Sequence, residues 1–253
     1  MIDQGESVLA KLRNKARLTG KNFQLLIQLF CQEEFLRKIA HSKYKDNLIL
    51  KGGLFLYCIS GFEGRPTMDI DLMVRNLSNK LQDIEEVTNQ IISQNTGNDF
   101  IVFKIKSVKT IAPQRDYHGA RVKIIAQIKN TKTPFDVDMG IGDVIIPKAE
   151  IRILPTQLPN FEEPVVMTYS LESTIAEKFD AIISRMELSS NKGMQMKWKH
   201  FIEGTLKIEI EFIDVIETIS SFISPIFDAI VNENELIGIW NPSLLKYESE
   251  ACT

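Results

Sequence analysis

The sequence predicts an α+β fold, in which a sheet is flanked by helices and followed by a C-terminal helical bundle. Three observations support this prediction. Residues 7–40 carry apolar side chains near helical spacing, ahead of the first strand signal. Alternating patterns at 101–106 and 121–128 indicate strands with one wet face, which favours antiparallel pairing. The apolar residues of 206–230 are dense enough to be buried in a bundle.

The length of 253 residues suits one large domain or two small ones. The interval 147–168 is rich in proline, which commonly marks connections between compact parts. We therefore predict a first domain at 1–155, with a helical lead-in, and a helical bundle domain at 156–253. The prolines that support this boundary are Pro147, Pro155, Pro159 and Pro164.

The cysteine content argues against two classes of protein. Cys31, Cys58 and Cys252 are scattered and form no C-x-x-C pair, which disfavours both a disulfide framework and a zinc site. No basic region followed by an apolar run begins the chain, so no signal peptide is visible. No apolar stretch reaches the length of about 20 residues that spans a bilayer. We expect a cytoplasmic protein without a membrane partner.

Charge is unevenly distributed along the chain, although the formal net charge is only −3. Residues 101–132 contain eight basic residues and one acidic residue, and residues 203–253 contain ten acidic residues and two lysines. This asymmetry suggests one surface that faces a polyanion and another that is acidic. Two solvated faces would produce the same pattern, so both interpretations stay open.

The stretch from Leu48 to Asp71 combines features of a phosphate site and a metal site. A short apolar strand ends at Lys51-Gly52-Gly53, and a helix-compatible segment, Leu54–Ile59, follows. Glycines at a helix start allow phosphate oxygens to approach backbone N–H groups. Beyond a glycine-rich turn, Asp69 and Asp71 lie two apart in a strand and therefore point to one face, where both can reach one divalent cation. These are the parts of a nucleoside triphosphate–Mg²⁺ site.

The next elements supply further candidates. Residues 81–92 carry one apolar stripe and predict a helix. In the strand-like run Thr133–Asp143, Asp136 and Asp138 again share a face, and one of them could be a third metal ligand or the base for an attacking hydroxyl. A cation shared with the first aspartate pair would offset the cost of burying such a carboxylate. Alternatively, these residues cap a loop.

A helix is expected to begin at Ser170-Leu171-Glu172. Lys178 and Arg185 lie seven residues apart on it, close to two turns, and so occupy one face. That face could meet triphosphate oxygens. The alternative is that both side chains point into solvent.

Several of these segments resemble the AbiEii nucleotidyltransferase family, toxins of bacterial toxin–antitoxin and abortive-infection systems within the DNA polymerase β-like superfamily. The first motif of the family resembles Lys51-Gly52-Gly53 followed by Arg65, Thr67, Asp69 and Asp71. Phe135–Gly140 resembles its later acidic strand, aligned on Asp138, and Ser170–Lys178 resembles its helix with a glutamate–lysine pair. The resemblance extends from about Leu48 to about Glu203.

The resemblance implies a nucleotidyltransferase-like mixed sheet and the Mg²⁺-dependent (or Mn²⁺-dependent) transfer of a nucleotide from an NTP to an acceptor hydroxyl. RNA, and tRNA in particular, is the expected acceptor, and a cognate antitoxin is a further expected partner. The implied catalytic residues are Asp69, Asp71, Asp138 and Lys178, of which the three aspartates also bind the metal. The implied nucleotide-binding residues are Lys51, Gly52, Gly53, Arg65, Thr67 and Arg185.

Two departures from the family pattern motivate alternatives. Leu54 stands where the family commonly has Ser or Thr, and His200, in the segment 197–203, stands where an aspartate is expected. The chain could therefore be an NTP-binding protein of the same fold with weakened or lost catalysis, acting through a protein partner. An interaction protein with an acidic C-terminal bundle and a metal-dependent phosphohydrolase are further candidates. The nucleotide, the acceptor and the oligomeric state stay open.

Overall fold

In the computed structural model, the chain divides into two compact units, residues 1–174 and 175–253. The first unit contains the large sheet, and the second contains helices and a small hairpin. The described residues are 3–63, 66–111, 119–142, 145, 148–186, 192–203, 210–236, 238–241 and 243–248.

Two helices lead into the sheet, as the apolar pattern of residues 7–40 predicts. Helix α1 (Gln4–Thr19) begins at Asp3, whose side chain accepts a hydrogen bond from the Glu6 N–H, and it ends at Gly20 in the left-handed conformation. Helix α2 (Phe23–Ala40) packs against α1 and against the sheet, so most of its length is buried.

The first unit is built on a seven-stranded sheet with the order β3-β4-β5-β2-β1-β7-β6. Strand β2 pairs with β5 in parallel, and so does β1 with β7, whereas the other pairs are antiparallel. The sheet is therefore mixed, and the α+β fold class is confirmed. The strands are β1 (Leu48–Lys51), β2 (Asp69–Val74), β3 (Ile101–Ile111), β4 (Gly119–Ile128), β5 (Thr131–Gly140), β6 (Glu150–Ile153) and β7 (Val165–Thr168).

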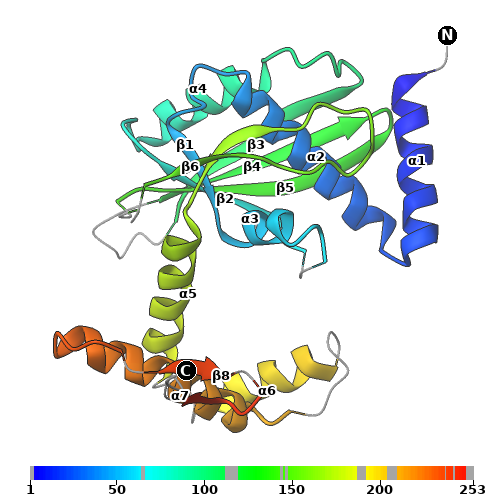
Figure 1. The fold of residues 1–253 in the computed structure, drawn as a ribbon. Coiled ribbons are helices and arrows are strands. Elements are labelled where there is room, and N and C mark those ends of the chain that lie inside the picture. The colour runs from blue at the N-terminus through cyan, green and yellow to red at the C-terminus, as the bar shows by residue number, and fades with distance from the viewer. Residues whose placement is uncertain are drawn as a thin grey trace. The chain divides into compact units, whose positions relative to one another are not determined.

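Helices cover one face of this sheet (Figure 1). Helix α4 (Leu81–Ile92) contacts β3 and β4, while α2 contacts β5, β7 and α4. The strand residues on this face are buried and apolar, as at Val122, Ile124 and Val137. Because side chains alternate along a strand, the intervening residues of β4 and β5 lie on the opposite face, where they are partly or fully exposed.

A buried charge cluster joins α2 to two distant segments. The guanidinium of Arg37 forms ion pairs with Glu33 and Glu34, and its side chain has no exposed surface. Glu34 also accepts a hydrogen bond of 2.7 Å from the Asn98 side chain, and Glu33 accepts one from the Gln157 backbone N–H. Buried charges are tolerated when they are paired and hydrogen-bonded in this way. The cluster thus ties the loops at 98 and 157 to one helix.

The proline-rich interval contains strands, not only a connection. The boundary predicted at residue 155 falls between β6 and β7, which pair with each other and extend the sheet. Pro155, Pro159 and Pro164 all lie between these two strands, where they interrupt no ladder hydrogen bond. The division into two compact units falls within helix α5 (Leu171–Met186), between residues 174 and 175.

The second unit contains the rest of α5, α6 (Lys192–Phe201), α7 (Phe212–Val231) and a hairpin of β8 (Ile239–Asn241) and β9 (Lys246–Glu248). The hairpin was not predicted. Phe222 of α7 packs against the facing rings of Trp240 and Tyr247. Among the described residues, no helix is both long and apolar enough to cross a membrane.

Candidate active site

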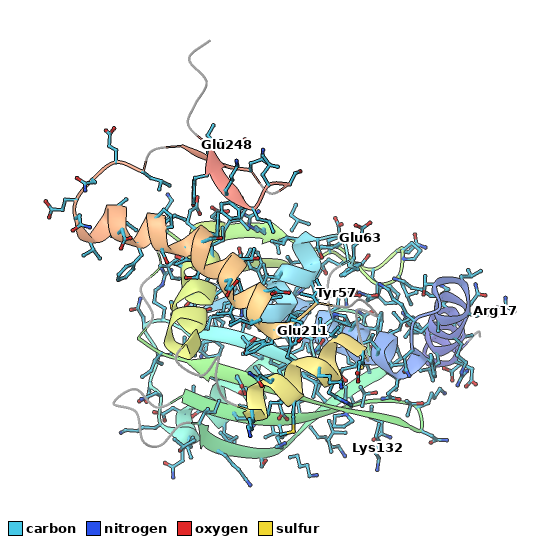
Figure 2. The ribbon with its side chains drawn as sticks, turned by 90° about the horizontal axis from the view of Figure 1, so that it is seen from below. Arg17, Tyr57, Glu63, Lys132, Glu211 and Glu248 are labelled. Atoms are coloured by element: carbon cyan, nitrogen blue, oxygen red, sulfur yellow. The ribbon has the colours of Figure 1, made fainter. Side chains whose placement is uncertain are left out.

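The glycine pair lies where β1 passes into helix α3 (Gly52–Ile59). Gly52 has a φ of 66°, which L side chains rarely adopt, and a Cβ there would lie 2.1 Å from Oδ2 of Asp71. A Cβ on Gly53 would lie 3.0 Å from Cβ of Thr67. Both glycines are thus explained by close approach, and the backbone at the start of α3 lies directly against Asp71. Tyr57, labelled in Figure 2, lies farther along the same helix.

Four carboxylates gather on the open face of the sheet. Asp69 and Asp71 are partly exposed and alternate with the buried Ile70 and Leu72 of β2, so they share a face as predicted. The parallel register of β2 and β5 places Asp69 opposite Asp136 and Asp71 opposite Asp138. The structure therefore brings the three predicted metal ligands, together with Asp136, into one patch.

Cations flank the carboxylates on both sides. In the registers of β1 with β2 and of β4 with β5, Lys51 lies opposite Asp71 and Arg121 lies opposite Asp138. Arg121 donates from Nε to Oδ1 of Asp138 at 2.7 Å and from Nη2 to Oδ2 at 2.6 Å, so the pair is bidentate. Lys123, two residues farther along β4, lies opposite Asp136 and donates a hydrogen bond to its Oδ2 at 3.2 Å.

The electrostatics differ between the two strands of the patch. Burial raises the pKa of Asp69 and of Asp71, and the negative charge of Asp138 raises both further. A hydrogen bond from the Gly53 backbone N–H and the charge of Lys51 partly offset this effect at Asp71. In contrast, the hydrogen bonds to Asp138 raise the pKa of Arg121 and hold it charged. The carboxylates of β5 are thus paired with cations of β4, whereas burial and repulsion disfavour the charged forms of Asp69 and Asp71.

The donor set at this patch suits a divalent cation. Carboxylate oxygens are the ligands that Mg²⁺ and Mn²⁺ prefer. A cation between Asp69 and Asp71 would stabilise the charged forms that burial and the charge of Asp138 disfavour. Within the described part of the chain, however, no group of three or more acidic, histidine or cysteine residues is arranged to hold a metal. Since both oxygens of Asp138 are occupied by Arg121, the three-aspartate metal set stays a prediction.

Of the three remaining nucleotide-binding candidates in the first unit, the structure describes two. Lys51 ends β1, with its Nζ 5.3 Å from the centre of the Tyr169 ring. Thr67 packs against Gly53, and its Oγ1 lies 3.5 Å from the Asp69 backbone nitrogen. Arg65 lies outside the described residues.

Three candidates belong to the second unit. Lys178 is exposed on α5, and Arg185 lies on the same helix, of which only the backbone is described at that position. His200 is exposed near the end of α6, beside an ion pair of 3.9 Å between Lys199 and Glu203. The functional roles of these residues stay predictions.

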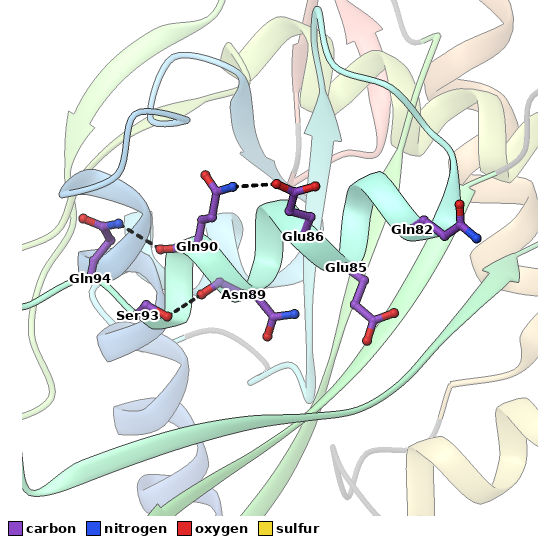
Figure 3. Close-up of a pocket in the computed structure, with 7 residues that line it drawn as sticks. All are labelled: Gln82, Glu85, Glu86, Asn89, Gln90, Ser93 and Gln94. Atoms are coloured by element: carbon purple, nitrogen blue, oxygen red, sulfur yellow. Dashed lines mark hydrogen bonds between the residues drawn. The ribbon is translucent and has the colours of Figure 1, made fainter.

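A polar hollow of about 570 Å³ lies elsewhere, along one side of α4 (Figure 3). Its residues bond mostly to one another along the helix, as Gln90 donates to Glu86 at 3.1 Å and Ser93 to the Asn89 carbonyl at 2.7 Å. One helix and its end supply all of the lining, which includes none of the predicted site residues. This hollow is therefore not a candidate for the active site.

The sequence did not assign partners to Asp136 and Asp138. Arg121 and Lys123 belong to the basic stretch 101–132, which was expected to face a polyanion or solvent, and the structure places both beside the carboxylates. Lys104 lies opposite Ile125 and shares their face, while Lys106 lies at a break in the β3–β4 register. A signal was present, because the short turn at 129–130 sets which residues of the β4–β5 hairpin face each other.

Two solved structures, both from Helicobacter pylori, are similar to this chain. One is described as a candidate nucleotidyltransferase; it is 16% identical, with 64% of this chain and 69% of that chain covered and a TM-score of 0.35. The other is JHP933, 12% identical, with coverage of 84% and 98% and a TM-score of 0.40. No curated protein matches.

A protein-family model matches the part of the chain that contains the candidate active site. The family model of the nucleotidyl transferase AbiEii toxin, from type IV toxin–antitoxin systems, matches residues 34–202. The matched range includes the glycine pair and all four aspartates of the open face. It spans more than half of the chain, and the chain therefore belongs to the AbiEii family of nucleotidyl transferase toxins.

Proposed function

We propose that this protein transfers a nucleotide from an NTP to an acceptor hydroxyl, with Mg²⁺ or Mn²⁺ held by Asp69 and Asp71. One observation carries the proposal. The first backbone groups of α3 lie against Asp71 so closely that Gly52 has no room for a side chain. A helix start binds phosphate oxygens and a carboxylate pair binds a divalent cation, so a triphosphate with its metal fits this juxtaposition.

Each residue of the site has a separate role in this proposal. The backbone at the start of α3 and the charge of Lys51 bind phosphate oxygens. The Gly53 N–H fixes the orientation of Asp71. Asp138 accepts the proton of the attacking hydroxyl once it is free to do so. When bound, the divalent cation neutralises phosphate charge and stabilises the leaving pyrophosphate. The family resemblance implies a catalytic role for Lys178.

RNA is the acceptor that the charge pattern supports best. Lys104, Arg121 and Lys123 share the open face with the carboxylates, and Lys132, labelled in Figure 2, is the second residue of β5, opposite Gln127. Cations beside a catalytic patch can bind the phosphates of a polynucleotide, and such binding weakens as salt rises. Family membership also implies a cognate antitoxin as a partner.

The test is transfer of label from each NTP to purified total tRNA in the presence of Mg²⁺ or Mn²⁺. We expect the Asp69→Asn, Asp71→Asn double variant to fall to background, because both proposed metal ligands are lost. Asp46→Asn is the matched control. Asp46 is exposed and precedes the first residue of β1, whereas Lys51 and the site lie at the other end of that strand. Transfer by the double variant at the rate of the control would refute the site.

A second candidate is an NTP-binding protein that does not turn the nucleotide over. The observation that favours it is the bidentate engagement of Asp138 by Arg121, which leaves the proposed base occupied. Calorimetric binding of an NTP without label transfer to tRNA, other RNA or protein would support this candidate over the enzyme.

A further inference from the structure

Arg121 competes directly for the third carboxylate of the patch. Its guanidinium covers both oxygens of Asp138, at 2.7 and 2.6 Å, and its Nε lies 3.8 Å from Oδ2 of Asp136. The side chain of Asp138 is 21% exposed and that of Arg121 is 40% exposed. The guanidinium can therefore move into solvent without unpacking the core, whereas the carboxylate is held closer to the sheet.

The position of this pair makes it relevant to metal binding. Asp138 is the direct neighbour of Asp71 across the β2–β5 ladder. A divalent cation held by Asp71 and Asp138 would use oxygens that now accept hydrogen bonds from Arg121. A guanidinium carries a full positive charge that it does not lose at any ordinary pH, so it also repels a cation at the same carboxylate.

We propose that Arg121 is a positioning residue that serves as the internal counter-ion of Asp138 in the metal-free protein and must release Asp138 when a divalent cation binds. This inference rests on the proposed function, because it takes the cation proposed for Asp69 and Asp71 and adds Asp138 as a further ligand. In the absence of a cation, Arg121 offsets the repulsion among the neighbouring carboxylates and keeps Asp138 on the open face. Its presence lowers the affinity of the site for the metal.

The experiment measures Mn²⁺ binding to the full chain without nucleotide, by the electron paramagnetic resonance signal of free Mn²⁺. We expect Arg121→Gln to bind Mn²⁺ about fivefold more tightly than the wild type, the size expected for loss of a partly exposed ion pair. Arg121→Lys keeps the charge and loses the bidentate geometry, so its affinity should lie between the two. The Lys variant also decides the matter if the Gln variant does not fold.

The matched control is Lys109→Gln. Lys109 lies opposite Arg121 on β3, so this substitution removes one positive charge from the same region and leaves the Arg121–Asp138 pair in place. We expect its Mn²⁺ affinity to change by less than about twofold. An equal gain in the Lys109 and Arg121 variants would show a general charge effect and overturn the proposal. Equal or weaker Mn²⁺ binding by both Arg121 variants would also overturn it, since Arg121 would then orient Asp138 without leaving it.

A final arm separates this inference from the proposed function. Asp71→Asn should lose Mn²⁺ binding if the metal lies at the patch. If Asp71→Asn binds Mn²⁺ as the wild type does, the metal site itself is refuted, and the role of Arg121 falls with it. If Asp71→Asn loses binding while the Arg121 variants gain none, the metal site stands and only the counter-ion role is refuted.

Discussion

Replacing Gly52 by alanine tests whether the close approach of α3 to Asp71 is required. Two effects are expected. An L residue at a φ of 66° costs about 1–2 kcal/mol of folding free energy. In addition, the new Cβ would lie 2.1 Å from Oδ2 of Asp71, whereas carbon and oxygen pack at about 3.5 Å. Asp71 or the start of α3 must therefore shift by about 1 Å.

The two effects separate with a matched control. Gly20 has a φ of 68°, and a Cβ there would meet no atom within 4 Å. Gly20→Ala therefore carries the backbone cost without the displacement of a carboxylate. Urea unfolding should show both variants destabilised, with Gly52→Ala losing more.

Activity should distinguish the variants more sharply than stability. A displacement of about 1 Å at a catalytic group can lower the rate by about 100-fold, so Gly52→Ala should lose nucleotidyl transfer while Gly20→Ala keeps it. Mn²⁺ binding should follow the same order. If Gly52→Ala transferred label and bound Mn²⁺ within about twofold of the Gly20 variant, the close approach would have no functional importance.

Three further predictions concern stability and reactivity. Arg37→Met should lower the free energy of unfolding by about 3–5 kcal/mol in urea titrations, because it leaves two buried carboxylates without their partner; a loss below 1 kcal/mol would contradict this. Asp71→Asn should raise the free energy of unfolding in metal-free buffer, since burial and the charge of Asp138 raise the pKa of Asp71 and its charged form therefore opposes folding. For the same reason, the contribution of Asp71 to wild-type stability should fall as the pH rises from the ordinary pKa of an aspartate through the raised one. In a Cys252→Ser variant, Ellman's reagent at pH 8 should label Cys31 and Cys58 only after unfolding, because burial raises the pKa of both thiols, that of Cys58 to about 12; rapid labelling of the folded protein would contradict this.

The features that the sequence predicts well are set by neighbours along the chain. The face shared by Asp69 and Asp71 follows from the two-residue period of a strand. The turn from β1 into α3 follows from a glycine pair directly after an apolar run. The helix at 81–92 follows from its apolar stripe and agrees with the structure to the residue. Each of these depends on contacts within a few residues, which a sequence pattern records.

Features that depend on pairing across the sheet were harder to predict. The four-residue strands β6 and β7 lie on either side of three prolines, and each strand is too short to show a period of its own. Their place in the sheet comes from pairing with each other and from the pairing of β7 with β1.

The charged residues of the open face come from four strands, whereas the motif of the glycine pair with Asp69 and Asp71 includes residues of only two. One row of paired residues crosses four adjacent strands and consists of Lys51, Asp71, Asp138 and Arg121. The two acids lie side by side in the middle, with one cation at each end. Lys51 contributes charge beside Asp71, which keeps a raised pKa, whereas Arg121 binds Asp138 through two hydrogen bonds. The negative charge of Asp138 is therefore neutralised by direct hydrogen bonds, whereas that of Asp71, next to the glycine pair, is only partly offset by Lys51 and the Gly53 N–H.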